Sequence, residues 1–408
     1  MDDITQAIRE QYEHYPYPSG PPMQRVATDA RLLLSLGQKS RPDALQPIRV
    51  LDAGCGRGVG LLGCATLQPD VEFTGIDINR VALQELQEQI KARGLSNVRV
   101  QEINLMTLEG LDVPEGGYDV IYSSGVLHHL SDPDEGLRQL RSVLAPHGVI
   151  SMMVYATYGR QPLYRLINAA KLLNNSDASF SERIAPTREL AKYCTETVLK
   201  ETPWDHVAGT NDVEFVDLCL NANETSYSVD TMWSLLAATE LKFLAWSLPE
   251  QWSAKVLPEG ELRDKAMTLS DLDLYRLVEQ VTWQQSLELV IGHQENEPRE
   301  VFDANEININ AYAVSPEVSF YLESKNRRTG KNIQSLTYKR GSDEHPVVCT
   351  DISQVTALAI LSEQFEAFTG DAFVQVMGED GVAEQDAISS LEYFVAQGVL
   401  YRPHLTDL

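Results

Sequence analysis

The sequence predicts an α/β fold built around a mainly parallel sheet, and two observations support this prediction. From about residue 48, short apolar runs alternate with amphipathic stretches, an order typical of parallel strands with helices on both faces. The first run ends in Asp52, and Gly54, Gly56 and Gly58 follow before the next helix begins. A length of 408 residues leaves room for more than one domain.

The composition narrows the classes of function. Lys and Arg total 33 against 59 Asp and Glu, which gives a formal net charge of -26. A chain this acidic repels phosphate backbones, and this argues against nucleic acid as its main partner. The five cysteines include no Cys-x-x-Cys pair, so we expect neither a disulfide framework nor a metal site.

The first residues and the hydropathy of the chain indicate where in the cell the protein is expected. No uncharged run reaches the roughly 18 residues that a membrane-spanning helix needs. The chain opens with Met1, Asp2 and Asp3, whereas secretion signals open with basic residues. We therefore expect a cytoplasmic protein without membrane contact.

Residues 1–46 are predicted to form an N-terminal arm or lid. A short helical pattern is followed at residues 15–22 by a proline-rich turn, and proline cannot continue a helix interior. Tyr12, Tyr15 and Tyr17 either close over a ligand or pin the arm to the domain surface, so they are candidate substrate-binding residues.

The alternating region, residues 47–155, supplies most of the predicted sheet. Apolar runs predict strands at 48–52, 71–77, 98–103, 118–123 and 149–155. Amphipathic stretches predict helices at 58–66, 79–93 and 134–144. Gly94 after the second helix and Asp132-Pro133 before the third mark helix ends.

Residues 156–226 interrupt this alternation and are mostly helical in pattern, notably at 163–173 and 187–199. We interpret them as a cap inserted above the carboxyl edge of the sheet, where such folds bind ligands. The chain then returns to the sheet through residues 227–296, with helices expected at 230–238 and 271–283 and strands at 241–247 and 286–293.

Residues 297–408 differ in character and predict a separate small α+β domain. Helical segments at 352–369 and 384–397, followed by an apolar run at 398–401, resemble a winged-helix-like module. Residues 325–340 form a basic island, which we expect to be a hairpin. A solvated hairpin tip and a docking site for an acidic partner both explain this island, and the tail is also a candidate surface for a homodimer.

The glycine-rich stretch after the first strand carries the chemistry. Glycines permit positive φ and let the backbone approach a ligand closely. Asp77 ends the next strand, 25 residues beyond Asp52, where a carboxylate accepts hydrogen bonds from a ribose diol. A second glycine spacing at residues 58–63 begins six residues after Asp52, so we expect it to lie in a helix rather than to hold phosphate.

Further motifs complete a resemblance to a known family. With Asn104 after the third strand and Ser-Ser-Gly-Val-Leu-His-His-Leu at 123–130, the sequence resembles the class I S-adenosylmethionine-dependent methyltransferases. The resemblance covers residues 48–155 and 227–293. It implies a Rossmann-like sheet of seven strands, the last one antiparallel, in an enzyme whose cofactor is S-adenosyl-L-methionine.

The same resemblance assigns roles to single residues. Asp52 would lie near the ammonium group of the cofactor, and Asp77 would hold its ribose hydroxyls. The family often has Asp at the position of Asn104, but an amide oxygen also accepts hydrogen bonds. The remaining implied cofactor residues are Gly54, Cys55 and Gly56 along the methionine part, Ile78, Asn104 and Leu105 at the adenine, and Ser123 and Ser124 beneath the sulfonium.

Methyl transfer from a sulfonium is an in-line displacement, so the protein must mainly align the acceptor with the methyl group. His128, His129, Tyr155 and Tyr158 follow the fourth and fifth strands and are candidates to lie near this group. A histidine accepts protons near neutral pH. Alternatively, one histidine packs structurally and the other flanks the pocket without proton transfer.

The acceptor is indicated by a narrower resemblance. Residues 11–18 and 154–164 are similar to bacterial methyltransferases acting on protein side chains, including, more loosely, those for phycobiliprotein asparagine and outer-membrane-protein lysine. With the cap and the tail, this favours transfer to a nitrogen of a protein side chain. A small-molecule O- or N-methyltransferase and a non-catalytic scaffold that keeps the cofactor fold are the alternatives.

The end of the cap supplies candidate substrate-binding residues. Asn221, Asn223 and Glu224 lie in a polar stretch just before the chain returns to the sheet. A polar loop leading into a capped helix explains the same residues. Both interpretations remain open at the level of sequence.

Overall fold

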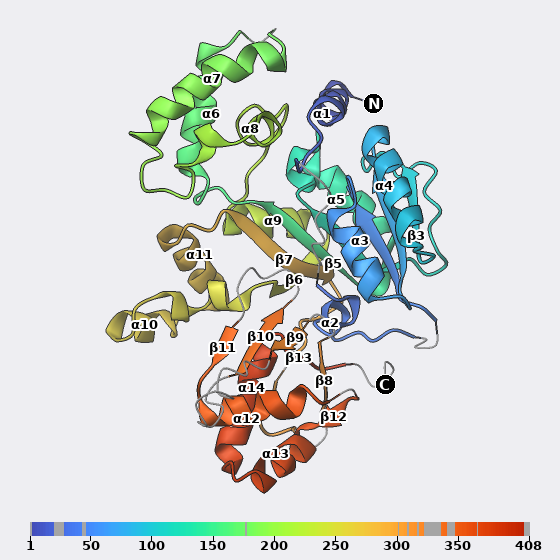
Figure 1. Ribbon diagram of the computed structural model, residues 1–408, viewed down its shortest axis with the longest axis vertical. Coiled ribbons are helices and arrows are strands. Elements are labelled where there is room, and N and C mark those ends of the chain that lie inside the picture. The colour runs from blue at the N-terminus through green and yellow to red at the C-terminus, as the bar shows by residue number, and fades with distance from the viewer. Residues whose placement is uncertain are drawn as a thin grey trace, which may run out of the picture.

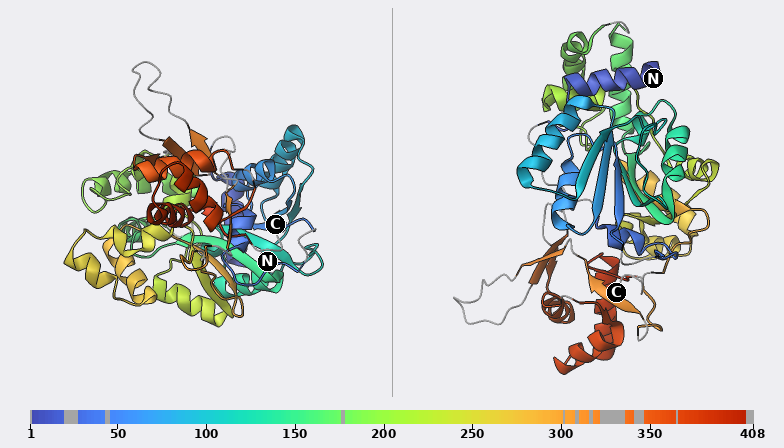
Figure 2. Two further views of the ribbon diagram at one scale, coloured as in Figure 1. Left: turned by 90° about the horizontal axis from the view of Figure 1, so that it is seen from below. Right: turned by 90° about the vertical axis from the view of Figure 1, so that its right-hand side faces the viewer.

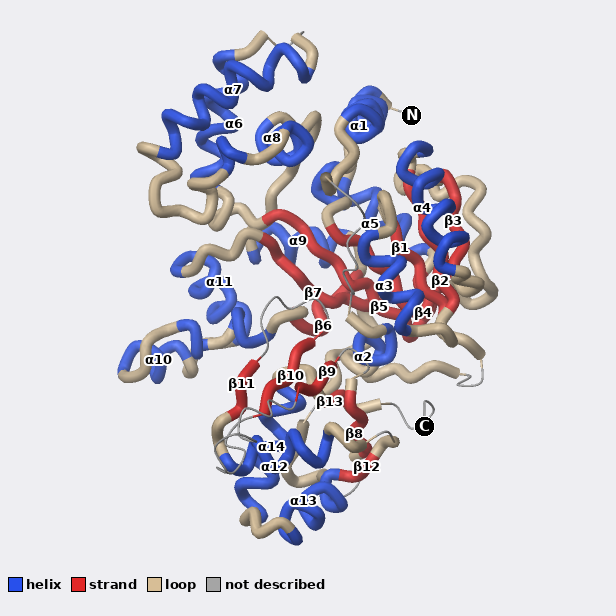
Figure 3. Tube along the Cα trace, viewed as in Figure 1, coloured by secondary structure: helices blue, strands red, loops and turns tan. Residues whose placement is uncertain are grey.

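The computed structural model describes residues 2–19, 28–42, 46–175, 178–300, 302–307, 310–315, 318–321, 336–340, 347–364 and 366–403. A central sheet with helices on both faces forms the middle of the molecule (Figures 1 and 3). A helical cap lies beyond one end of its strands, and a smaller α+β part lies beyond the other. Within these ranges no helix combines the length and apolarity needed to cross a membrane.

The central sheet has seven strands in the order β3-β2-β1-β4-β5-β7-β6. Neighbouring strands pair in parallel, except that β7 is antiparallel to both β5 and β6. The order and the antiparallel strand confirm the Rossmann-like sheet that the resemblance implies. The strands are β1 (Arg49–Ala53), β2 (Glu72–Asp77), β3 (Val98–Glu102), β4 (Tyr118–Ser124), β5 (Leu144–Tyr155), β6 (Leu241–Trp246) and β7 (Ser286–His293).

Both faces of the sheet are buried, which explains why its strands are nearly continuous apolar runs. Leu51 and Ile121 enter one core, and their neighbours Val50 and Val120 enter the other. Helices α2 (Ala30–Leu34), α3 (Val59–Leu67) and α4 (Arg80–Arg93) cover the face of Val50. Helices α5 (Pro133–Ser142), α9 (Val229–Ala238) and α11 (Asp271–Val281) cover the face of Leu51.

Several helix ends agree with the sequence. Gly94, with φ 65°, ends α4, and the Asp132 side chain accepts a hydrogen bond from the Glu135 N–H at the start of α5. Gly60 and Gly63 lie inside α3, so the second glycine spacing is helical, as expected. Short helices connect β6 to α11, namely η3 (Pro249–Trp252), η4 (Ala254–Val256) and α10 (Glu261–Ala266).

The cap contains α6 (Gln161–Leu173), α7 (Phe180–Thr195), η2 (Val207–Gly209) and α8 (Asp212–Cys219). It has an apolar core of its own that includes Leu166, Ala191 and Phe215. The expected start of the second cap helix at residue 187 is wrong. Helix α7 begins seven residues earlier because Ser179 and Glu182 form a capping box and the helix accommodates Pro186. Helix α8 was not predicted.

The C-terminal part is α+β, as predicted, with two three-stranded sheets in the orders β11-β10-β9 and β12-β8-β13. A single helix over 352–369 is wrong, because residues 368–369 pair with β8 instead and a new helix follows. The tip of the expected basic hairpin, residues 325–331, lies outside the described residues. The elements are β8 (Ala311–Val314), β9 (Val318–Tyr321), β10 (Leu336–Arg340), β11 (Val347–Cys349), α12 (Ile352–Leu361), β12 (Phe368–Thr369), α13 (Gly370–Glu379), α14 (Glu384–Ala396) and β13 (Leu400–Tyr401).

Candidate functional site

The loop after β1 is tied to the end of β2 by backbone hydrogen bonds. The N–H groups of Gly54 and Cys55 donate to the carbonyl of Ile76 at 2.8 and 2.9 Å, and that of Gly56 donates to Asp77 Oδ2 at 2.8 Å. A Cβ on Gly54, where φ is 87°, would lie 2.3 Å from a methyl carbon of Val126. A Cβ on Gly56 would meet nothing within 4 Å. The loop is therefore tightly packed at Gly54 and open at Gly56, as a ligand lying along its backbone requires.

Two carboxylates flank this loop. Asp52 is half-buried, and within the described part of the chain no group donates a hydrogen bond to it. Burial, and then the neighbouring Asp77 carboxylate, raise the pKa of Asp52 to about 7. Burial also raises the pKa of Asp77, although hydrogen bonds from the N–H groups of Asn79 and Gly56 oppose this rise.

An unpaired carboxylate that is costly to ionise is stabilised by a cation. The Asp52 environment therefore fits the ammonium group of S-adenosylmethionine. In the described ranges, no three or more His, Cys, Asp or Glu side chains gather into a group that could hold a metal ion.

The other predicted cofactor residues lie along the same edge of the sheet. Ile78 follows Asp77 and is half-buried, and Leu105 is buried. Asn104 Oδ1 accepts a hydrogen bond from the Met106 N–H at 2.9 Å, so a local turn fixes the orientation of its amide. The oxygen expected to face adenine thus has one hydrogen bond already and retains a second lone pair.

The two serines at the end of β4 differ from each other. Ser123 is 1% exposed, and its hydroxyl has no hydrogen-bond partner in the described part of the chain. Ser124 is exposed. Their Cα atoms pair with Met152 and Met153 of β5, so both serines lie between the glycine loop and the end of that strand.

Three side chains form a stack beyond these serines. The rings of His128 and Tyr155 lie 3.8 Å apart, centroid to centroid, with 25° between their planes. The guanidinium carbon of Arg160 lies 3.5 Å from the centre of the Tyr155 ring. Groups this close to a ring centre must occupy its two opposite faces, so Tyr155 is sandwiched between His128 and Arg160.

His128 is the buried histidine of this stack. Neither of its ring nitrogens has a hydrogen-bond partner among the described residues. Burial holds its pKa well below the ordinary value, and the nearby His129 and Arg160 lower it further. His128 is therefore uncharged at neutral pH.

His129 faces the loop at the end of the cap. Its Nδ1 lies 2.8 Å from the carbonyl oxygen of Asn223, which places the proton on Nδ1 and leaves Nε2 as an acceptor. Burial lowers the pKa of His129 to about 4. Tyr158 is 37% exposed and takes no part in the stack, so the structure brings together three of the four predicted catalytic candidates.

The N-terminal arm reaches the cap through α1 (Asp3–His14), which lies beside the cap helices and beyond the same end of the strands (Figure 2). The Tyr12 hydroxyl donates to Asp217 Oδ1 of α8 at 2.9 Å and accepts from Asn221 Nδ2 at 3.3 Å. Gln11 Oε1 accepts from the Ala222 N–H at 2.7 Å. Helix α1 is thus fastened to α8 and to the loop after it.

The same arm is fastened to the sheet domain. Arg9 pairs with Glu102 at 3.2 Å, and Arg57 of the glycine loop donates to the carbonyl of Pro18 at 3.1 Å. The arm therefore bridges the cap and the glycine loop.

The three arm tyrosines differ in their surroundings. Tyr12 is held by Asp217, whereas Tyr15 packs edge-on against Phe180 of α7. Tyr17 is 40% exposed. The Tyr12 hydroxyl is thus bonded to a buried carboxylate of the cap.

Two buried charges next to this site escaped prediction from sequence. Arg160 is 3% exposed, and its Nη2 lies 3.6 Å from Glu224 Oε1. Burial raises the pKa of Asp217 to about 7, although the Tyr12 hydrogen bond opposes this rise. A weak signal exists for Asp217, which is the single charge in the apolar run at 215–220.

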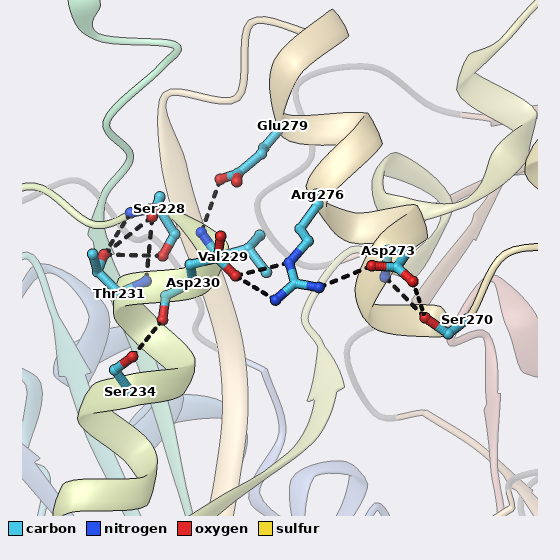
Figure 4. A network of polar contacts seen from close by, with 9 residues as sticks. All are labelled: Ser228, Val229, Asp230, Thr231, Ser234, Ser270, Asp273, Arg276 and Glu279. Atoms are coloured by element: carbon cyan, nitrogen blue, oxygen red, sulfur yellow. Dashed lines mark hydrogen bonds and ion pairs between the residues drawn. The ribbon is translucent and has the colours of Figure 1, made fainter.

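The loop that carries Asn221, Asn223 and Glu224 ends at a firm anchor (Figure 4). Glu279 Oε2 accepts from the Val229 N–H at 2.8 Å at the start of α9. Arg276 of α11 pairs with Asp230 at 2.6 Å. These contacts fix the return of the chain from the cap to the sheet.

Comparisons with known proteins agree with this geometry. The model of a methyltransferase domain family matches residues 46–207. An uncharacterized protein of Synechococcus is 32% identical over 293 residues, which cover 68% of this chain and 69% of that protein. The malonyl-[acyl-carrier protein] O-methyltransferase of Halalkalibacterium halodurans is 27% identical over 153 residues, which cover 38% of this chain and 55% of that enzyme.

Among solved structures, PKMT2 from Rickettsia typhi in complex with AdoHcy (S-adenosylhomocysteine) matches with a TM-score of 0.65 at 16% identity. The match covers 95% of this chain and 77% of that chain, and at this identity it shows a shared fold. The sheet order, the glycine loop with its two carboxylates and the matched relatives agree with one another. The chain belongs to the class I S-adenosylmethionine-dependent methyltransferases.

Proposed function

We propose that this enzyme transfers the methyl group of S-adenosylmethionine to a nitrogen of a protein side chain. The observation that carries the proposal is the extent of the likeness to PKMT2, a protein lysine methyltransferase of Rickettsia typhi. That likeness covers 95% of the chain, so it extends over the cap and the C-terminal part as well as the sheet. Small-molecule methyl transfer gives no reason for a C-terminal part of this size.

The cofactor would lie along the open side of the glycine loop. Asp52 would pair with its ammonium group, and the backbone at Gly54 and Gly56 would follow its methionine part. Asp77 would accept hydrogen bonds from the ribose hydroxyls. Its present bond from the Gly56 N–H holds the carboxylate at the loop, where the ribose would arrive.

At the adenine end, Ile78 and Leu105 would pack against the ring, and Asn104 would accept from its amino group with the second lone pair. Ser123 and Ser124 would lie beneath the sulfonium. Of the two, Ser124 is exposed and could face the cofactor directly, whereas the Ser123 hydroxyl is buried and has no partner in the described part of the chain.

Bound S-adenosylmethionine supplies an activated methyl group on a positively charged sulfur. The residues of this chain would align the acceptor with that methyl group and keep water away. The stacked rings of His128 and Tyr155 form a rigid, uncharged wall beside the ends of β4 and β5. Alignment of this kind supplies several kcal/mol toward the reaction, about 7 to 11 in well-oriented systems.

A small-molecule acceptor is the competing function. The Halalkalibacterium relative is named for transfer to malonyl-[acyl-carrier protein], and its match covers 38% of this chain. A match of that length cannot include the sheet domain, the cap and the C-terminal part together, so the relative carries little information about the acceptor of this enzyme.

Incubation of the purified protein with cofactor labelled in its methyl group, together with a cell lysate, separates these functions. Label in a protein band supports the proposal, whereas label confined to the small-molecule fraction contradicts it. The Asp77→Ala variant is the control, because the loss of the ribose contact should remove labelling in either case.

A further inference from the structure

His129 and Tyr155 present polar atoms that remain accessible beside the stack. Both ring nitrogens of the neighbouring His128 are buried and have no hydrogen-bond partner in the described part of the chain. His129 Nε2 and the hydroxyl of the half-buried Tyr155 are likewise unpartnered there but, unlike those nitrogens, neither atom is fully buried. Accessible lone pairs of this kind receive hydrogen bonds from a ligand. These two atoms are therefore candidates to hold the methyl acceptor.

Strand pairing relates Tyr155 to the expected position of the methyl group. Ser124, which would lie beneath the sulfonium, pairs with Met153 of β5. Tyr155 comes two residues after Met153, so it projects from the same face of the sheet about 7 Å further along the strand. This is also the face of Val149, which packs in the core under α3, the helix that opens at the glycine loop. Tyr155 therefore borders the space in which the methyl group is expected.

His129 adjoins Tyr155 from a second direction. The centroids of the two rings lie 5.7 Å apart, with 89° between their planes. His129 Nδ1 is bonded to the carbonyl of Asn223, which leaves the lone pair on Nε2. Burial lowers the pKa of His129 to about 4, so this lone pair remains free at neutral pH. The imidazole thus acts as a hydrogen-bond acceptor, and it is too weak a base to take up a proton.

Both rings are fixed before any ligand arrives. Tyr155 is sandwiched between His128 and the guanidinium of Arg160, and His129 is held by its bond to Asn223. Burial, and then the charge of Asp217, raise the pKa of Tyr155, so its hydroxyl stays neutral. Two neutral acceptor atoms in fixed positions align a ligand without a large cost in side-chain entropy.

Two acceptor atoms match an uncharged primary amine. Such a nitrogen carries two N–H hydrogens and one lone pair, so bonding both hydrogens to fixed acceptors sets the direction of the lone pair. In-line displacement requires that this lone pair be aimed at the methyl group. A hydroxyl acceptor brings a single hydrogen and would leave one of the two atoms unbonded.

We propose that His129 Nε2 and the Tyr155 hydroxyl oxygen receive the two N–H hydrogens of an uncharged primary amine and so aim its lone pair at the methyl group. The proposal rests on the proposed function, because it names the groups that hold the acceptor nitrogen. His128, whose ring nitrogens are buried, keeps a packing role beside them.

The transfer step balances without a base. The amine gives the proton of its ammonium form to water before it binds. Its lone pair then forms the N–CH₃ bond, the S–CH₃ bond breaks, and the electron pair of that bond stays on sulfur to give S-adenosylhomocysteine. The positive charge passes from sulfur to nitrogen, and the product leaves as a methylated ammonium. A carboxamide nitrogen would have to lose a proton during transfer, and neither His129 nor Tyr155 is a base that could take it.

Tyr155→Phe tests the proposal because it removes the hydroxyl and keeps the stacked ring. We expect kcat/KM for the protein acceptor to fall about 5- to 10-fold, mainly through kcat, since an amine that is bound but not aimed reacts slowly. The affinity for S-adenosylhomocysteine, measured by calorimetry, should stay within about twofold. Tyr193→Phe is the matched control, because Tyr193 lies in the cap and is 69% exposed, and it should behave as wild type. Equal kcat/KM in wild type and Tyr155→Phe would overturn the proposal.

His129 is tested by two amides that each replace one ring nitrogen. The Asn amide nitrogen in His129→Asn takes the place of Nδ1 and can keep the bond to the Asn223 carbonyl, but it offers nothing at the position of Nε2. The longer His129→Gln brings an acceptor oxygen to the position of Nε2 and gives up the Asn223 bond. We expect His129→Gln to retain several times more kcat than His129→Asn. The reverse order would show that His129 serves the Asn223 contact alone and would contradict the proposal.

Loss of fold is separated from loss of contact by thermal unfolding of each variant. His206→Asn is the control for the histidine substitutions, because His206 is an exposed residue of the cap. If both His129 variants fail to fold, Tyr155→Phe decides the question by itself, since its ring and packing are unchanged.

The product and the labelling rates distinguish this inference from the proposed function. Acid hydrolysis of the labelled protein leaves a methylated amine intact, as the inference expects, but releases methylamine from a methylated amide. Released methylamine would overturn the inference and leave the proposed function standing. If wild type labels no protein, the proposed function fails and this inference with it, whereas equal labelling by wild type, Tyr155→Phe and His129→Asn removes the inference alone.

Discussion

The two sides of the site are built in different ways. On the cofactor side, backbone N–H groups of residues 54–56 bond to the end of β2, and the candidate side chains follow strand ends. On the acceptor side, the polar groups come from segments far apart in sequence: Tyr12, Tyr155, Arg160, Asp217 and Glu224.

Because of this difference, substitutions can change the acceptor side more easily than the cofactor side. A backbone-built loop changes only if the sheet changes, whereas side chains from three separate stretches of the chain can be exchanged one at a time. We therefore expect the cofactor side to serve any acceptor, and the opposite side to set which acceptor is methylated. Substitutions on the two sides should accordingly have different consequences.

The largest effect is expected on the cofactor side, from Gly54→Ala. The added Cβ would lie 2.3 Å from Val126, at a residue with φ 87°. We expect affinity for S-adenosylmethionine to fall about 100-fold, which corresponds to about 3 kcal/mol. Calorimetry measures this loss.

Gly60→Ala is the control for this variant. Gly60 lies inside α3 with nothing within 4 Å of an added Cβ, so we expect unchanged affinity and a gain of about 0.5–1 kcal/mol in stability. Similar affinity losses in both variants would show that the loop is not specially constrained.

Tyr12→Phe should break the junction between the arm and the cap. It removes the hydrogen bond to Asp217 and leaves that carboxylate, which is 3% exposed, with no donor among the described residues. The cost is about 1–3 kcal/mol, so we expect methyl transfer to fall about 10-fold and the arm to be cleaved faster by proteases.

Tyr15→Phe is the matched substitution, because the Tyr15 ring packs on Phe180 and its hydroxyl is not part of the Asp217 network. It should leave both the transfer rate and the cleavage rate near those of wild type. An equal effect of the two substitutions would mean that the arm acts through packing alone.

The pH dependence of cofactor affinity follows from Asp52. Its pKa of about 7 lies above the ordinary value, and only the ionised carboxylate pairs with an ammonium group. Affinity should thus be complete above about pH 7 and fall by up to about tenfold per pH unit below it. Calorimetry across this range should show the fall in affinity. The Asp52→Asn variant should bind the cofactor weakly, with an affinity that does not change with pH. If its affinity instead changed with pH as in wild type, the titrating group would be another residue.

Arg57→Ala gives the smallest expected effect. Arg57 donates to the carbonyl of Pro18 and pairs at 2.7 Å with Glu85, whose side chain is 44% exposed. The loss should be about 0.5–1 kcal/mol, or two- to fivefold in transfer rate, with cofactor affinity nearly unchanged. A large loss of cofactor affinity would place Arg57 in the cofactor site itself.

The cofactor side could be predicted from the sequence because its information is local. Asp52 and Asp77 end successive strands, and parallel strands bring their carboxyl ends to one edge. The requirement for glycine at positions 54 and 56 is equally local, because it comes from the positive φ of these residues and from the adjoining strand. Sheet order and the antiparallel β7 followed from the family resemblance rather than from these residues.

On the acceptor side, the sequence names Tyr12, Tyr155 and Glu224 as candidates. It could not predict the long-range contacts that join Tyr12 to Asp217 and Glu224 to Arg160. Arg160 and Glu224 are 64 positions apart in the sequence, and nothing in either neighbourhood indicates the other. The prediction of one helix over 352–369 is wrong because of another long-range contact. The pairing of Phe368 with Tyr312 overrides the local helical preference. Tyr158 follows β5 in the chain, but it is 37% exposed and takes no part in the stack.

Identification of the modified atom tests the central claim most directly. The labelled protein from the lysate incubation is digested, and mass spectrometry of the methylated peptide locates the methyl group. We predict a methyl group on the side-chain nitrogen of lysine, asparagine or glutamine, absent when Asp77→Ala replaces wild type. A methyl group on a carboxylate oxygen, or label found only in a small molecule, would contradict the account.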